Sequence, residues 1–171
     1  MQTYTDIDWT TWTPVERATL IFAMRDEQVL LIHKKRGLGA GKVNGPGGRL
    51  DPGETSAQCA VREMQEEVCV TPLNPRLCGE LKFQFLDGHS IHGLIYRADG
   101  IDGEPQETDE AIPFWCPLSD VPYGRMWMDD RLWFPLMLND RYFTSQYLFD
   151  DDTMLGCEIM PLPHPPAQPP F

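Results

Sequence analysis

One stretch of 23 residues, Gly48–Val70, constrains this chain more than any other feature. It places four glutamates and two arginines, Arg49 and Arg62, in a short loop and in the segment that follows the loop. The turn sequence Asp51-Pro52-Gly53 closes the loop. Thr55 or Ser56 then offers an N-cap, and apolar residues recur with helical spacing. The sequence therefore predicts a helix from about Ser56 to Val68.

Three of the glutamates share one side of this predicted helix. Glu63, Glu66 and Glu67 stand at positions i, i+3 and i+4, whose side chains project together. Like charges this close repel one another, and only Arg62, four residues before Glu66, offsets them. A bound divalent cation would remove the repulsion. Mg²⁺ suits such a site because it takes oxygen ligands and shares its coordination sphere with water and phosphates. The alternative is a solvated acidic helix face.

The spacing of these residues resembles the Nudix box, Gly-x5-Glu-x7-Arg-Glu-(apolar)-x-Glu-Glu-x-Gly-(apolar). Every fixed position has its match except the last glycine, which is Cys69 in this chain. In the family that glycine ends the helix, where a left-handed residue is common. We therefore expect the chain at Cys69 to leave the helix by another route. The resemblance implies the Nudix fold, an α/β structure in which a mixed β-sheet is sandwiched between helices (α/β/α).

The rest of the chain divides into predicted strands, one further helix and two polar ends. The pattern predicts hairpins that join 17–24 to 29–34, 77–85 to 91–97 and 141–149 to 154–159, with a further strand at 112–116. A second helix is expected at 129–139, with Pro135 in its first turn. Helices between strands imply packing on a mixed sheet.

These elements define the expected domain organisation. We divide the chain into an N-terminal extension (1–16), a Nudix hydrolase domain (17–160) and a Pro-rich C-terminal tail (161–171). The tail holds six prolines in its eleven residues, so we expect it to be extended or disordered.

Charge and composition restrict the partners of the chain. The formal net charge of −12 argues against a nucleic acid polymer, because bulk repulsion opposes its binding. No apolar run has the length of a membrane span and the chain starts with no signal-like segment, so we expect no membrane partner. The five cysteines are scattered and odd in number, which favours reduced thiols and a cytoplasmic location. Nothing in the sequence indicates an oligomeric state.

Further segments resemble one Nudix subfamily, the animal oxidised purine nucleoside triphosphatases, which are 8-oxo-dGTP diphosphatases. The segments are the glycine-rich loop 34–48, the acidic run 107–110 and residues 126–135. With them the resemblance covers roughly residues 17–159, and it implies a pocket for a purine base. Two residues depart from the subfamily, since Leu38 replaces an aromatic residue and Val43 replaces a tryptophan.

The resemblance assigns roles to individual residues of this pocket. Asn44 would hydrogen-bond the purine edge, and Trp127 would stack on the base. Asp129 and Asp130 would read the polar edge of the base. Adjacent carboxyl groups do not easily ionise together, so one of the two could keep a proton and act as a donor. The pocket would also be lined by Thr19, Phe83, Phe85 and Met128.

The resemblance also implies the chemistry at the phosphate chain. Mg²⁺, with Mn²⁺ as a substitute, would be held by Glu63, Glu66, Glu67 and Gly48. Catalytic roles would fall to Glu66, Glu67, Arg62 and Glu110. Glu110 would serve as an extra metal ligand or as the base for the attacking water, and Glu54 would orient Arg62 or join the residues around the metal ion. Lys34, within a cationic patch that also holds Lys35, Arg36 and Lys42, would contact phosphate.

Several interpretations stay open at this point. Adjacent aspartates before an apolar helix are commonly caps, Trp127 could be a core residue, and Asn44 a simple turn residue. Glu110 could be a solvated loop acid. The function implied by the resemblance is hydrolysis of an oxidised purine nucleoside triphosphate to nucleoside monophosphate and pyrophosphate, a reaction of nucleotide-pool sanitation. The alternatives are a Nudix hydrolase of a nucleotide sugar, a dinucleoside polyphosphate or an RNA 5′ end, and a catalytically silent nucleotide-binding module.

Overall fold

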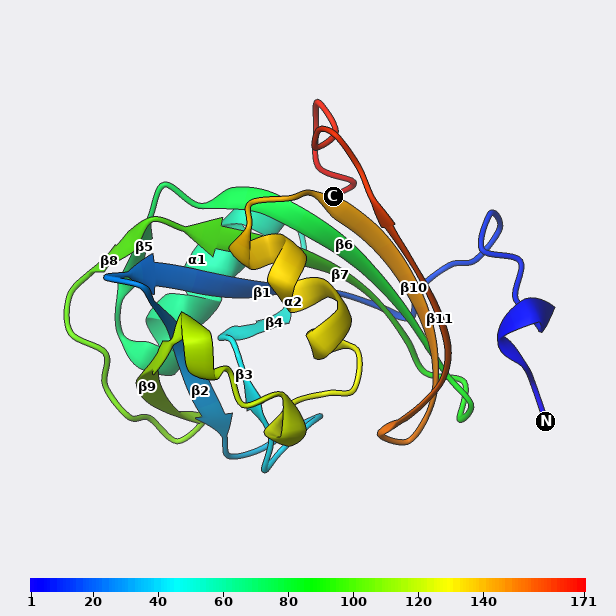
Figure 1. Ribbon diagram of the computed structural model, residues 1–171, viewed down its shortest axis with the longest axis horizontal. Coiled ribbons are helices and arrows are strands. Elements are labelled where there is room, and N and C mark those ends of the chain that lie inside the picture. The colour runs from blue at the N-terminus through cyan, green and yellow to red at the C-terminus, as the bar shows by residue number, and fades with distance from the viewer.

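A mixed β-sheet of nine strands forms the centre of the computed structural model, which describes residues 1–171 (Figure 1). The main path of the sheet runs β11-β10-β6-β7-β1-β2-β3, while β4 pairs with β1 and β9 pairs with β2. The strands are β1 (Glu16–Arg25), β2 (Gln28–Lys34), β3 (Val43–Asn44), β4 (Gly47–Arg49), β6 (Arg76–Phe85), β7 (Ser90–Ala98), β9 (Ala111–Pro117), β10 (Phe143–Asp150) and β11 (Thr153–Pro161).

The sheet is mixed because two of its pairings are parallel. Strand β1 runs parallel to β7, and β10 runs parallel to β6, while the other pairs are antiparallel. The three predicted hairpins and the strand before the second helix are all present. The sequence did not predict β5 (Thr71–Leu73) and β8 (Gly100–Asp102), which form a separate two-stranded sheet. These strands are short and carry no alternating pattern by which they could have been found.

Helix α1 (Ser56–Val68) covers one face of the sheet and has the predicted bounds. Thr55 begins it with a capping box: its hydroxyl accepts a hydrogen bond of 3.2 Å from the backbone N–H of Gln58, whose side chain accepts one of 3.0 Å from the N–H of Thr55. The apolar face of α1 packs against alternate residues of β1, β2 and β7. The buried cluster on this side includes Ile21, Leu30, Ile32, Ala60, Met64, Val68, Leu94 and Tyr96.

The end of α1 corrects an expectation from the sequence. Cys69 does not leave the helix by another route, because its φ of 64° and ψ of 28° place it in the left-handed conformation that glycine would take. Its backbone N–H keeps a 3.0 Å hydrogen bond to the carbonyl of Gln65. The chain therefore keeps the helix-ending geometry of the box, at the steric cost that a Cβ brings to this conformation.

Helix α2 (Asp130–Leu138) lies on the opposite face of the sheet, where Figure 1 shows it in front of β1 and β7. Pro135 stands in the interior of α2, so the expectation that it lies in the first turn was wrong. Proline removes one backbone hydrogen bond there. Trp133, Phe134 and Met137 are fully buried in the second core cluster, and the burial of these large apolar side chains outweighs that loss.

Residues at both ends of the chain form hydrogen bonds with the central domain. In the N-terminal segment, which includes the 3-10 helix η1 (Tyr4–Asp6), the indole N–H of Trp12 donates a 2.9 Å hydrogen bond to Gln84 on β6. At the other end the carbonyl of Phe171 accepts a 2.5 Å hydrogen bond from Ser56, the first residue of α1. Two further 3-10 helices, η2 (Leu118–Asp120) and η3 (Tyr123–Arg125), lead from β9 to α2. None of the helices combines the length and the apolar character needed to cross a membrane.

Candidate active site

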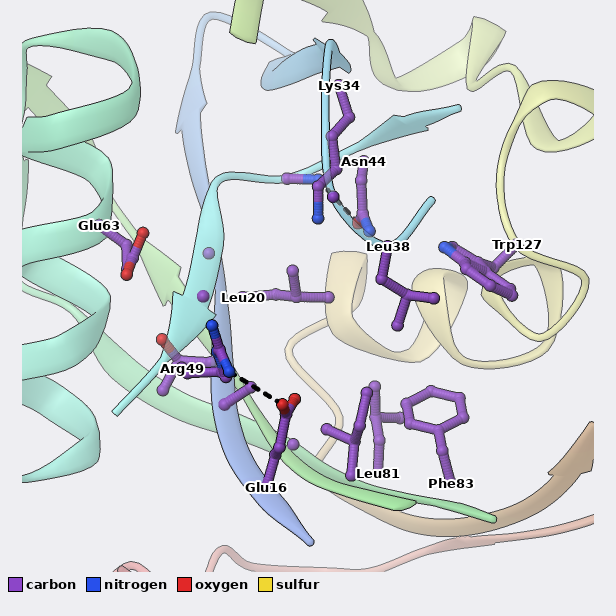
Figure 2. Close-up of a pocket in the computed structure, with 18 of the residues that line it drawn as sticks. Glu16, Leu20, Lys34, Leu38, Asn44, Arg49, Glu63, Leu81, Phe83 and Trp127 are labelled. Carbon is purple, nitrogen blue, oxygen red and sulfur yellow. Dashed lines mark hydrogen bonds and ion pairs between the residues drawn. The ribbon is translucent and has the colours of Figure 1, made fainter. Parts of the chain in front are cut away.

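A cavity of about 700 Å³ opens between the glycine-rich loop, helix α1 and the loop before α2. Figure 2 shows Glu63 of α1 on one side of it and Trp127 on the opposite side, with Leu20 between them. Leu81 and Phe83 of β6 lie along another edge of the cavity. The cavity therefore has an acidic end and an aromatic end, which are set by different parts of the fold.

The acidic end holds two buried carboxyl groups. Glu63 is 8% exposed and Glu67 is 4% exposed, and no hydrogen-bond partner reaches Oε2 of Glu67. Burial, followed by the charge of Glu63, raises the pKa of Glu67 to about 8, although Lys34 acts in the opposite direction. A buried carboxylate with a free oxygen is costly unless a cation meets it. This donor set fits a hard divalent cation that takes oxygen ligands.

Arg62 organises the carboxylates of the box. Its guanidinium donates two hydrogen bonds to Glu54, of 2.7 and 2.8 Å, and one of 2.8 Å to Glu63. A fourth, of 3.2 Å, reaches Glu66. The hydrogen bonds from Arg62 lower the pKa of Glu54 to about 2, so Glu54 stays ionised and anchors the arginine.

The carboxylates of Glu63, Glu66 and Glu67 are not already arranged to coordinate a metal ion. No group of three or more histidine, cysteine, aspartate or glutamate side chains stands in metal-binding geometry. Arg62 instead bonds to two of the three carboxylates, those of Glu63 and Glu66. The residue types and the free oxygen of Glu67 fit a metal ion, while their arrangement in this structure is that of an arginine-bridged cluster.

Gly48 lets the backbone of β4 lie directly against this cluster. A Cβ at this position would stand 2.5 Å from Oε1 of Glu63, so any larger residue would displace the carboxylate. The buried thiol of Cys59 lies 3.5 Å from the carbonyl of Gly48 and accepts a 3.3 Å hydrogen bond from the Thr19 hydroxyl. Position 48 therefore requires glycine, because a side chain there would collide with the carboxylate of Glu63.

Among the four residues of the cationic patch, only Lys34 is free of an acidic partner. Lys35 pairs with Glu107 at 3.0 Å, Arg36 with Glu110 at 3.0 Å and Lys42 with Asp152 at 3.2 Å. Lys34 lines the cavity and forms no salt bridge. It can therefore meet an anion without giving up another contact.

The aromatic end is built around Trp127. The glycine-rich loop packs on the indole so closely that a Cβ on Gly39 would lie 2.8 Å from Nε1. Phe85 and Phe149 meet the ring edge-on, with centroids 6.3 and 5.7 Å away. Asn44, from the same loop, lines the cavity and accepts a 2.8 Å hydrogen bond from the N–H of Gly45 through Oδ1. That bond leaves the amide NH₂ of Asn44 available.

Two buried aspartates complete this end of the cavity. Asp129 and Asp130 are only 1% and 3% exposed, and Oδ1 of Asp129 and Oδ2 of Asp130 have no hydrogen-bond partner. Asp129 occupies the N-cap position of α2 but makes no capping hydrogen bond, so the capping interpretation was wrong. Burial raises the pKa of Asp129 to about 6, and burial together with the charge of Asp129 raises the pKa of Asp130 well above its usual value. The pKa of Asp130 is thus raised by the charge of its neighbour as well as by burial, which favours a proton on Asp130.

The cavity brings together most of the residues singled out in the sequence. Those that line it are Thr19, Lys34, Asn44, Gly48, Glu63, Glu66, Glu67, Phe83, Phe85, Glu110, Trp127, Asp129 and Asp130. Glu54 and Arg62 lie behind the acidic end. Met128 is not brought into the cavity, because its sulfur accepts a 3.3 Å hydrogen bond from the N–H of Met154 on β11 and its surface is 42% exposed.

The sequence did not reveal part of the cavity rim. Glu16 pairs with Arg49 at 3.1 Å and lies 3.4 Å from His89, and all three residues line the cavity (Figure 2 labels Glu16 and Arg49). Arg49 follows the box glycine and could have been noticed there. Glu16 and His89 are brought near each other only by the pairing of β1 with β7, so the sequence carried no signal for them.

Known proteins resemble this chain in sequence and in structure. Residues 14–137 match the NUDIX domain family. The chain is 43% identical to the "Oxidized purine nucleoside triphosphate hydrolase" of Danio rerio over 132 residues, which are 77% of this chain and 85% of the relative. It is 37% identical to the protein of the same name from Mus musculus, over 82% of this chain and 92% of the relative. The crystal structure of the MutT protein from Bacillus halodurans superposes with a TM-score of 0.78 at 26% identity, covering 88% of this chain and all of that one (100%).

Proposed function

The chain belongs to the Nudix family, and from that premise we propose that it hydrolyses oxidised purine nucleoside triphosphates to nucleoside monophosphates and pyrophosphate. The observation that carries the proposal is the cavity with two chemically different ends. Unpartnered carboxyl oxygens of Asp129 and Asp130 stand at one end, and that of Glu67 stands at the other. The names of the zebrafish and mouse relatives support this class of substrate.

Nudix hydrolases generally use divalent metal ions, and we propose Mg²⁺ here, with Mn²⁺ as a substitute. Glu63, Glu66, Glu67 and the carbonyl of Gly48 would hold it. When bound, such an ion neutralises phosphate charge and favours ionisation of an attacking water. Arg62, fixed by Glu54, keeps Glu63 and Glu66 in place through its 2.8 and 3.2 Å contacts.

The other groups of the acidic end act on the phosphate chain and on the water. Lys34 contacts phosphate, and its freedom from an acidic partner supports this role. Glu110 accepts a proton from the attacking water or joins the metal ligands. Its charge acts on Glu63 and Glu67, which supports a place near the reacting phosphorus.

The aromatic end selects the base. Trp127 stacks on the purine, and Asn44 donates from its free amide to the purine edge. Asp130 keeps its proton and donates, while Asp129 accepts, so together they match an edge on which an acceptor lies beside a donor. An oxo group next to a protonated ring nitrogen has that pattern. Thr19, Phe83 and Phe85 complete the walls of the pocket.

We also propose a small nucleotide as the partner and the cytoplasm as the location. The strongly acidic composition, with a net charge of −12, supports a substrate that arrives with its metal rather than a nucleic acid polymer. The scattered, odd-numbered cysteines support a reducing compartment.

A substrate panel tests the proposal. Pyrophosphate release would be measured with Mg²⁺ for 8-oxo-dGTP, 2-oxo-dATP, dGTP and dATP, beside a nucleotide sugar and a dinucleoside polyphosphate. We expect kcat/KM to be highest for an oxidised purine triphosphate. A preference for the nucleotide sugar or the dinucleoside polyphosphate would keep the Nudix chemistry and remove the base assignment. Binding without turnover in Mg²⁺ or Mn²⁺ would identify a silent nucleotide-binding module.

A further inference from the structure

We propose that Arg36 restrains Glu110 in the substrate-free protein and that a polyphosphate chain releases it. In this scheme the guanidinium of Arg36 exchanges its carboxylate partner for a phosphate, which frees Glu110 to act at the acidic end of the cavity. The inference rests on the proposed function, because it concerns when one of its groups becomes available. The active site would then become complete only when the substrate is bound.

The first support is the geometry of the pair. Nη2 of Arg36 lies 3.0 Å from Oε1 of Glu110, and both side chains line the cavity. The backbones behind them are held separately: the N–H of Lys35 donates a 2.9 Å hydrogen bond to the carbonyl of Glu110, and Nζ of Lys35 donates one of 2.8 Å to the carbonyl of Thr108. The Arg36–Glu110 contact can therefore change partners while the two loops stay joined.

The second support is the place of Glu110 relative to the box. Glu110 lines the same cavity as Glu63 and Glu67, and its charge adds to the burial that raises the pKa of both carboxyl groups. Arg36 offsets part of that charge in the substrate-free protein. A free Glu110 would add a carboxylate to those of Glu63, Glu66 and Glu67, which favours cation binding.

The third support is the modest strength of the pair. The side chains of Arg36 and Glu110 are 64% and 44% exposed, and an exposed ion pair of this kind changes an equilibrium by about five-fold or less. A triphosphate carries several charges and accepts paired hydrogen bonds from a guanidinium. We therefore expect Arg36 to bind the phosphate in preference to Glu110. Lys34, which has no acidic partner, binds phosphate without such an exchange.

Metal binding by the nucleotide-free protein tests the restraint. Titration calorimetry with Mn²⁺ would compare the wild type, Arg36→Met, Glu110→Gln and the double variant. We expect Arg36→Met to tighten Mn²⁺ binding by about three- to five-fold. The same substitution in the Glu110→Gln background should have no effect, because the restrained group is already gone.

Lys35→Met supplies the matched control, because it removes a neighbouring cation that pairs with Glu107 instead. It should tighten Mn²⁺ binding less than Arg36→Met does. Two outcomes would reflect general charge alone and overturn the proposal. One is that Lys35→Met tightens Mn²⁺ binding as much as Arg36→Met does. The other is that Arg36→Met still tightens Mn²⁺ binding in the Glu110→Gln background.

Phosphate binding tests the exchange from the other side. Binding of inorganic triphosphate would be measured in EDTA, with no metal and no base present. Glu110→Gln should tighten it about three- to five-fold by freeing Arg36, and this gain should vanish in the Arg36→Met background. A gain that is the same in both backgrounds would overturn the proposal. Neither titration involves a nucleotide base or turnover, so failure of the substrate panel would leave both results interpretable.

Discussion

The indole N–H of Trp133 donates a 2.8 Å hydrogen bond to Oδ2 of Asp129, one turn earlier in the chain, and both groups are buried. The bond fixes the orientation of the carboxylate. It leaves Oδ1 of Asp129 buried at the cavity without a partner. Trp133 is fully buried in the core cluster, so the packing of α2 positions an acceptor at the aromatic end of the cavity.

The two aspartates should respond differently to substitution. Asp130→Asn resembles the protonated state that Asp130 already favours, so we expect it to be tolerated. Asp129→Asn removes an acceptor and leaves a donor unpaired, at a cost of about 1–3 kcal/mol or about 5- to 150-fold in kcat/KM for the preferred oxidised purine. The measurement is kcat/KM for 8-oxo-dGTP, 2-oxo-dATP, dGTP and dATP. An equal loss on all four substrates, in both variants, would assign these residues to folding or phosphate positioning.

Asn44→Ala should shift the same substrate ranking. Its free amide faces the cavity from the glycine-rich loop, while Oδ1 is already used by the N–H of Gly45. We expect the preference between the oxidised purine triphosphate and dGTP to change while the Mg²⁺ concentration at half-maximal rate stays the same. A change in metal dependence with the ranking preserved would place Asn44 at the phosphates instead.

The buried pair should also give the protein a pH-dependent stability. The pKa of Asp129 is about 6 in the folded protein, above its ordinary value of 3.8. The stability that this carboxyl contributes is therefore fully present below about pH 3.8 and is lost as the pH rises through about 6. Tm measured at pH 4.5 and at pH 7.5 should fall more between these values in the wild type than in Asp129→Asn. Parallel changes in the two proteins would show that Asp129 titrates normally.

Glu67→Gln should separate catalysis from stability. It removes a negative charge where we propose that the metal ion binds, so turnover should drop by orders of magnitude at saturating Mg²⁺. It also replaces a buried carboxyl group with a neutral one, so Tm in EDTA should be equal to or higher than that of the wild type. Glu66→Gln is the matched comparison, because its side chain is 57% exposed and its loss should lower turnover with little effect on Tm. Near-normal rates in both variants would remove the box from the mechanism.

Cys69→Gly should raise stability modestly and preserve activity. Cys69 adopts a φ of 64°, where a residue with a Cβ is strained by roughly 1 kcal/mol and glycine is not. Thermal melting and turnover of the variant would be measured side by side. Loss of activity at unchanged Tm would show that the cysteine does more than end the helix.

Local patterns in the sequence determined the box and its helix. The capping residue, the apolar spacing and the three glutamates place α1 at Ser56–Val68, as the structure shows. These features depend on residues a few positions apart. For such residues the helical period is enough to predict which side chains share a face of the helix. The hairpins were predicted for the same reason, because each joins two strand-forming runs of residues through a short turn. Pro135 and Cys69 were predicted wrongly because core packing and the helix-ending hydrogen bond override local preference at those two residues.

Only the tertiary structure decided which groups are buried, paired or free. The Arg36–Glu110 pair joins residues 74 positions apart, and the Glu16–Arg49 pair joins residues 33 positions apart. The sequence could name Asp129 and Asp130 but could not distinguish caps from buried carboxyl groups, because that depends on how α2 packs. Burial and pairing arise when distant segments exclude water from the same space. Those are the conditions that set the pKa of Glu67 and the free oxygens of the cavity.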